Sequence, residues 1–138
     1  MSKTNISFMN AYIELDTVCS CAMEVKRGGV SAYIRELEQM ERTDETKELL
    51  VTLKKYRSIR NRLAHEKDAI NGTGIVERAD IKWLRSFAKR VREKKDIISR
   101  SARQKRAAEL VSRMRPLLIV AVAAIAVICV AAAVISLT

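Results

Sequence analysis

The sequence predicts an all-helical protein: a small bundle of four to five helices followed by one transmembrane helix at the C-terminus. First, only one proline and four glycines occur in 138 residues, which leaves little turn material for many short strands. Second, apolar residues recur at steps of three and four, the spacing of one helix face. Third, the run Leu117–Leu137 carries no charge. We therefore expect a helical bundle over residues 1–98, a basic juxtamembrane helix or linker over 99–116, and a membrane anchor over 117–138.

The first two helices are separated by a glycine pair. The first helix is expected from Asn5 to about Lys26, ended by Gly28 and Gly29, because glycine is the usual residue just after a helix. A short second helix, capped by Ser31, is expected to continue to about residue 40. The spacing indicates this inward face for the first helix: Met9, Tyr12, Ile13, Asp16 and either Val18 or Cys19.

The third helix has the clearest pattern. Thr43 or Asp44 is expected to cap it, and acidic residues follow in its first turns, where the helix dipole favours them. Its apolar seam steps by 4, 3, 4 and 3 residues and includes one charged member. The seam comprises Leu49, Leu53, Tyr56, Arg60 and Leu63. An arginine on such a seam is costly to desolvate unless an anion meets it.

A fourth helix is expected after the break at residues 71–74, beginning at Asp80 or just before it. The same spacing would let it run on through Ala102 and Leu110 towards the C-terminal span. Its expected seam comprises Leu84, Phe87, Val91, Lys95 and Ile98.

The apolar run Leu117–Leu137 is long enough to cross a membrane. Its 21 residues would span roughly 31 Å as a helix, close to the thickness of the hydrocarbon core. The alternative is a buried core helix, but the rest of this short, charged chain could hardly surround it. Six basic residues lie between Arg100 and Arg115 just before the run, and the positive flank stays in the cytoplasm. We therefore expect single-pass anchoring in the cell membrane, as in tail-anchored proteins, with the lipid bilayer as a partner and the N-terminal domain cytoplasmic.

The positive charge is concentrated before this run. Residues 1–84 carry 14 basic and 13 acidic side chains, whereas residues 85–115 carry 12 basic and 3 acidic ones. Arg85, Lys89 and Arg92 share a helix face and could follow a nucleic-acid backbone. The alternative, which we favour, is a topology signal that also rests on anionic lipid.

No metal or cofactor is expected. The cysteines are Cys19, Cys21 and Cys129, and His65 is the only histidine, so a four-ligand zinc site within one chain lacks ligands. Cys19 and Cys21, two residues apart on a helix, point in different directions and cannot form an ordinary disulfide.

The densest polar cluster lies late in the third helix, in the segment YRSIRNRLAHE. It contains Arg57, Arg60, Asn61, Arg62 and His65. The run from Arg60 to His65 resembles the signature of the HEPN superfamily (higher eukaryotes and prokaryotes nucleotide-binding), in which an arginine, usually followed by a polar residue, precedes a histidine by a few positions. The resemblance implies a small helical bundle and, in many members, a metal-independent ribonuclease that acts as a dimer. Other members have lost activity.

The residue types of this motif suit RNA cleavage through the 2′-hydroxyl. Histidine can take or give a proton near neutral pH, and arginine offers a planar fork for phosphate. Asn61 is four residues from His65, so its amide can orient the imidazole. Arg60 is five residues from His65, about 140° around a regular helix. Because the chain has one histidine, an acid and a base both made of imidazole would require a homodimer.

Two classes of function stay open. One is a membrane-tethered endoribonuclease that uses Arg60, Asn61 and His65 across a dimer, with Arg57 and Arg62 binding RNA. The other is a non-catalytic helical module that binds a nucleotide or a protein partner at the membrane. A purely structural role for Arg60, in an ion pair with Asp16 or Glu14, is the competing interpretation.

Overall fold

The computed structural model describes residues 3–65 and 75–115. The chain divides into two units, residues 1–100 and 101–138. Within the described residues the structure contains helices and no strand, which confirms the all-helical class. The first unit holds α1 (Lys3–Ala22), α2 (Gly29–Gln39), α3 (Asp44–His65) and α5 (Arg78–Arg92). Residues 97–100 are also helical, and in the second unit residues 101–115 are helical and mostly exposed.

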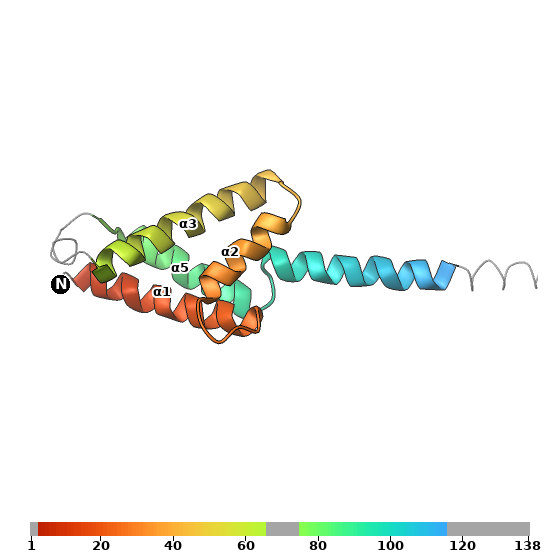
Figure 1. The fold of residues 1–138 in the computed structure, drawn as a ribbon, viewed down its shortest axis with the longest axis horizontal. Helices are drawn as coiled ribbons and strands as arrows, with labels where there is room; N and C mark the ends of the chain where they lie inside the picture. The colour runs from red at the N-terminus through yellow and green to blue at the C-terminus, as the bar shows by residue number, and fades with distance from the viewer. Residues whose placement is uncertain (1–2, 66–74, 116–138) are drawn as a thin grey trace, which may run out of the picture. The chain divides into compact units, whose positions relative to one another are not determined.

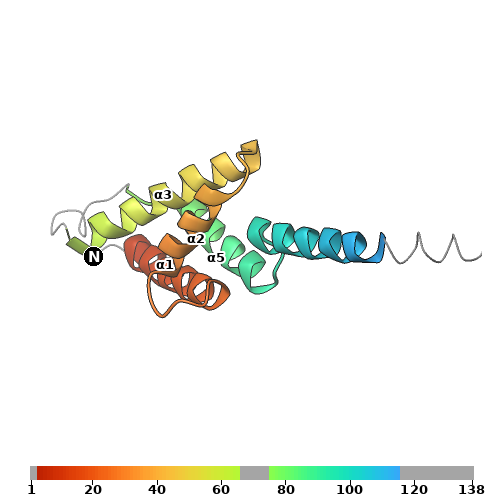
Figure 2. The ribbon, with the colours of Figure 1, turned by 45° about the vertical axis from the view of Figure 1, so that its right-hand side comes forward.

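The helices of the first unit form a small bundle. Helix α1 packs against α2, α3 and α5, and α2 also packs against α3. The start of α1 lies beside the end of α3 in both views of the ribbon (Figures 1 and 2). The core between the helices includes Phe8, Leu15, Tyr33, Leu53, Leu63, Leu84 and Phe87.

The aromatic side chains join the four helices. The Phe8 ring of α1 lies 5.9 Å from Tyr56 of α3, which lies 5.2 Å from Trp83 of α5. Trp83 stacks on Phe87 at 5.0 Å, and Phe87 meets Tyr33 of α2 edge-on at 5.5 Å. Such contacts stabilise beyond the area they bury, so the few aromatic residues of the chain hold the bundle in register.

The inward face of α1 agrees with the expected one only in part. Tyr12 and Cys19 are buried as expected, but Phe8, Ala11 and Leu15 are buried as well, whereas Ile13 is 55% exposed. Apolar residues extend around more than one face of α1, so spacing alone does not select the register; packing against α2, α3 and α5 does.

The α1–α2 connection also differs from the expectation. Helix α1 ends at Ala22, and Glu24 adopts a left-handed conformation (φ 54°). The Val25 amide then donates to the Ser20 carbonyl at 3.0 Å, as in a Schellman motif. Gly28, not Ser31, is the N-cap of α2, with φ 69°. The two glycines therefore begin α2 rather than end α1.

The cap of α3 agrees with one of the two expected residues. The Thr43 hydroxyl accepts a hydrogen bond from the Thr46 amide at 3.2 Å, which is the geometry of an N-cap. Leu53, Tyr56 and Leu63 of the expected seam are buried. Ile59 is buried as well, and Arg60 is half-buried at the edge of the seam.

The fourth expected helix is shorter than the pattern suggested. Helix α5 begins at Arg78, after Glu77, whose amide donates to the Asp80 carboxylate at 2.9 Å. It ends at Arg92, so Lys95 and Ile98 are not part of it. Lys94 has a left-handed conformation (φ 54°), and Asp96 then caps the residues that follow by accepting from the Ser99 amide at 3.2 Å. Helix α5 therefore ends at this turn, which places Asp96 in the core.

The described residues contain no helix long and apolar enough to span a membrane. The expected anchor, Leu117–Leu137, lies outside the described residues.

Candidate functional site: a cationic groove between α1, α2 and α3

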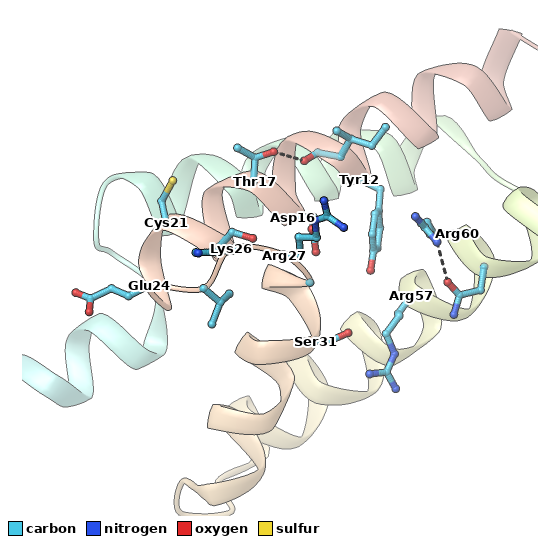
Figure 3. A pocket seen from close by; sticks show the side chains of 15 residues that line it. Tyr12, Asp16, Thr17, Cys21, Glu24, Lys26, Arg27, Ser31, Arg57 and Arg60 are labelled. Atoms are coloured by element: carbon cyan, nitrogen blue, oxygen red, sulfur yellow. Dashed lines mark hydrogen bonds between the residues drawn. The ribbon is translucent and has the colours of Figure 1, made fainter.

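A groove of about 840 Å³ lies between the second half of α1, the α1–α2 connection, the start of α2 and the side of α3. Its α3 wall carries Arg57, Arg60 and Asn61. Steps of three and four residues place these side chains on one face of the helix. Figure 3 shows Arg60 extending from α3 into the space towards α1, whereas Arg57 extends from α3 near Ser31 of α2.

The two groove arginines have no carboxylate partner within the described part of the chain. Arg60 Nη1 donates to Asn61 Oδ1 at 3.2 Å, and both arginines are half-buried. Neither ion pair considered for Arg60 is present: Glu14 pairs with Arg92 at 2.9 Å, and Asp16 accepts from a backbone amide. The groove wall therefore presents two positive charges that are available to an anion.

Asp16 holds the end of the groove where α2 begins. Its Oδ1 accepts a hydrogen bond from the Val30 amide at 2.9 Å, one of the unpaired amides of the first helical turn. The helix dipole favours a carboxylate at this end. Gly29 makes this approach possible, because a Cβ there would lie 2.2 Å from both the Asp16 carbonyl oxygen and the Ser20 nitrogen. The glycine pair and Asp16 thus fix α2 against α1.

Tyr12 lies on the α1 wall between these charges. Its side chain is 6% exposed and lines the groove. Burial, and secondarily the Asp16 charge, raise the pKa of Tyr12 to about 12, while Arg60 and Arg57 oppose the shift. The phenol is therefore protonated at neutral pH and can donate a hydrogen bond.

His65 is not in the groove. It is the last residue of α3, is exposed, and lines a neighbouring hollow of about 440 Å³ that also includes Arg57, Asn61 and Arg62. Helix α3 is α-helical to this residue, so Arg60 and His65 lie on different sides of it. Arg57 and Asn61 line both hollows, whereas Arg60 lines the groove and His65 lines the neighbouring hollow.

The basic residues of α5 lie apart from both hollows. Arg85 lines a separate hollow of about 360 Å³ near Ser7, Lys89 lies 3.9 Å from Glu93, and Arg92 pairs with Glu14. The structure therefore does not bring Arg85, Lys89 and Arg92 into the groove.

Sequence reasoning missed Tyr12 and Asp16 as groove residues. The spacing places both on the inward face of the first helix. This prediction is confirmed for Tyr12, which is buried and also lines the groove. The Gly28-Gly29 pair was the available signal for Asp16, because a glycine at the start of a helix allows another backbone to approach closely.

No group of three His, Cys, Asp or Glu side chains that could hold a metal ion occurs in residues 3–65 and 75–115. The polar side chains of the groove instead suit an anion.

Fold and site together define a small helical-bundle protein with an arginine-lined groove. The chain belongs to a family of unknown function, DUF6548, which it matches over residues 6–117. No curated protein and no solved structure matches it.

Proposed function

We propose that this protein is a membrane-tethered, HEPN-like, metal-independent endoribonuclease that binds RNA phosphate at Arg57 and Arg60 and uses His65 for proton transfer. The observation that carries the proposal is the pair of groove arginines without a carboxylate partner among the described residues.

The chemistry needs a base for the 2′-hydroxyl, an acid for the leaving oxygen and a cationic site for the phosphate. Arg60 supplies the cationic site, steadied by its hydrogen bond to Asn61 at 3.2 Å. His65 is exposed at the end of α3, where an imidazole can exchange protons with solvent and substrate. Because His65 and Arg60 face different hollows, the proposed active site joins two copies, and the His65 of each copy lies at the other's groove. There the imidazole takes the proton of the 2′-hydroxyl, and water supplies a proton to the leaving oxygen.

The proposed membrane tether rests on the sequence. The uncharged run Leu117–Leu137 has the length of a membrane span, and the cluster of basic residues before it would keep the bundle on the cytoplasmic side. Tethering would restrict cleavage to RNA near the membrane.

The experiment is incubation of the full chain, purified in detergent micelles, with total RNA in the presence of EDTA. We expect cleavage by the wild type and none by His65→Ala or Arg60→Ala. Arg35→Ala is the matched control, because it removes an exposed arginine of α2 that does not line the groove. Equal cleavage by the wild type and by His65→Ala would contradict the proposal.

A second candidate is a non-catalytic nucleotide-binding module. The separation of Arg60 and His65 into different hollows favours it, since binding at the groove needs no histidine. In that case the wild type binds RNA without cutting it, and His65→Ala binds equally well. Sedimentation distinguishes the two further, because the shared active site requires a homodimer and the binding module does not.

A further inference from the structure

The three tyrosines of the chain are all buried, but their hydroxyl groups differ. Tyr33 donates to Asp96 at 2.8 Å and Tyr56 donates to Asp80 at 3.0 Å. A buried tyrosine usually finds such a partner. The Tyr12 hydroxyl has no hydrogen-bond partner among the residues that the structure describes. Although the residue as a whole is only 6% exposed, its oxygen is not one of the fully buried unpaired atoms, so it is open to the groove.

The Tyr12 hydroxyl opens into the groove. Figure 3 shows the ring extending from α1 towards α3, with its oxygen on the side of Arg57 and Arg60. Both guanidinium groups are close enough to act on its ionisation, as is the carboxylate of Asp16. A neutral donor and two cationic side chains thus line the same groove.

We infer that this space binds one phosphate group of a nucleotide, with the Tyr12 hydroxyl donating a hydrogen bond beside the guanidinium groups of Arg57 and Arg60. The inference rests on the proposed function, because it names the residue and the ligand unit that the groove would use. A phosphate oxygen accepts from all three donors, and arginine matches phosphate geometry in two-point contacts.

The charges that line the groove set the orientation of the ligand. Its end near α2 carries acids and bases together (Asp16, Glu24, Lys26 and Arg27), whereas its α3 wall carries Arg57, Arg60 and the amide of Asn61 and no acid. The phosphate therefore lies on the α3 side of Tyr12. The groove continues past it along Ser20 and Ser31, whose hydroxyl groups suit a sugar. A volume of about 840 Å³ is within the range of small-ligand sites and holds a nucleotide, not a duplex.

The test compares two tyrosine-to-phenylalanine variants of the full chain in detergent micelles. Tyr12→Phe keeps the ring that packs on Phe8 at 6.4 Å and removes only the hydroxyl. Tyr56→Phe is the matched control, because it removes a hydroxyl that bonds within the protein. Binding is measured by fluorescence anisotropy with a labelled 2′-deoxy hexamer, which lacks the 2′-hydroxyl and cannot be cut through it.

Tyr12→Phe should raise the Kd about tenfold, the loss expected for one hydrogen bond to a charged group, and should leave the melting temperature unchanged or raised. Tyr56→Phe should do the opposite: lower the melting temperature and leave the Kd within about twofold. Equal Kd values for the wild type and Tyr12→Phe would overturn the inference. A melting temperature lowered by Tyr12→Phe would also overturn it, since the hydroxyl would then have a partner within the protein.

Two further measurements identify the ligand and separate the inference from the proposed ribonuclease. Adenosine monophosphate should compete with the hexamer better than glycerol phosphate does; equal competition would overturn the nucleotide in favour of a lipid headgroup. Hexamer binding that depends on Tyr12, without RNA cleavage by the wild type, would support this site and refute the ribonuclease. RNA cleavage with the same KM in Tyr12→Phe would support the ribonuclease and overturn this site.

Discussion

The Tyr33 hydroxyl donates a hydrogen bond of 2.8 Å to Asp96 Oδ2, joining α2 to a carboxylate 63 residues further along the chain. The same oxygen accepts from the Ser99 amide at 3.2 Å, so Asp96 both caps residues 97–100 and fixes them to the core. Asp96 is 4% exposed, and its other oxygen, Oδ1, has no partner among the described residues. Burial, together with the Asp96 charge, raises the pKa of Tyr33 far above its usual range, so the phenol stays a donor.

Tyr33→Phe should therefore lower the free energy of unfolding by about 2–3 kcal/mol, because it leaves the buried carboxylate with the Ser99 amide as its one remaining donor among the described residues. Asp96→Asn should cost less, within about 1 kcal/mol, since its carbonyl oxygen still accepts from both donors and the buried charge is removed. Urea unfolding of the full chain in micelles measures both. A larger loss for Asp96→Asn than for Tyr33→Phe would show that the carboxylate charge itself has a further partner.

Gly29→Ala should destabilise the bundle by about 3 kcal/mol, because the new methyl group would overlap the α1 backbone 2.2 Å away. Gly28→Ala is the matched control. Its Cβ would meet nothing within 4 Å, so only its left-handed conformation (φ 69°) is penalised, at about 1 kcal/mol. Thermal melts of the two variants check the difference, and equal shifts would contradict the close approach of α2 to α1.

Arg60→Ala should change the free energy of unfolding by less than about 1 kcal/mol, because Arg60 is half-buried and bonds to its neighbour Asn61 rather than to a carboxylate. It should nevertheless abolish RNA cleavage and weaken binding. Melting curves of Arg60→Ala and Arg60→Leu decide between this role and a structural one. A melting temperature that collapses for alanine and recovers for leucine would show a core group instead.

Stability should fall in acid through Asp80. Burial by itself would raise the pKa of this carboxyl, but hydrogen bonds from the Glu77 amide, Tyr56 and Lys55 outweigh burial and lower the pKa below its usual 3.8. A group whose pKa is lowered by folding stabilises the protein above the unfolded-state pKa and loses that contribution as the pH falls through the folded-state value. The loss should therefore appear below pH 4.

Asp80→Asn isolates this contribution from the other carboxylates. The gap between the urea midpoints of the wild type and Asp80→Asn should be present at pH 7 and should narrow as the pH falls below 4. A gap of constant size between pH 7 and pH 2 would show that the Asp80 charge contributes nothing.

The membrane topology has its own test. The uncharged run Leu117–Leu137 and the basic residues before it predict that protease added to sealed, right-side-out cells leaves the N-terminal bundle intact. Lysed cells are the control, in which the bundle should be digested. Digestion of the bundle from outside intact cells would refute the cytoplasmic orientation.

Local patterns in the sequence were sufficient for the helices themselves. The scarcity of glycine and proline predicted helices rather than strands. Three further features depend on residues a few positions apart, and each agrees with the structure: the seam of α3, the Thr43 cap and the start of α5 near Asp80. The physical reason is that caps and helix faces are set by interactions within one or two turns.

The groove was decided only by tertiary packing. Whether Tyr12 points at solvent or at α3 depends on which face of α1 meets the other helices, and α1 has apolar residues on several faces. Asp16 could have paired with Arg60 by charge alone, but the approach of Gly29 gives its carboxylate the Val30 amide instead. Likewise α5 ends at Arg92, although the apolar spacing continues. The chain turns there, and Asp96 accepts a hydrogen bond from the Tyr33 hydroxyl. Each outcome depends on a partner 14 or more residues away, and spacing along a single helix carries no information about such a partner.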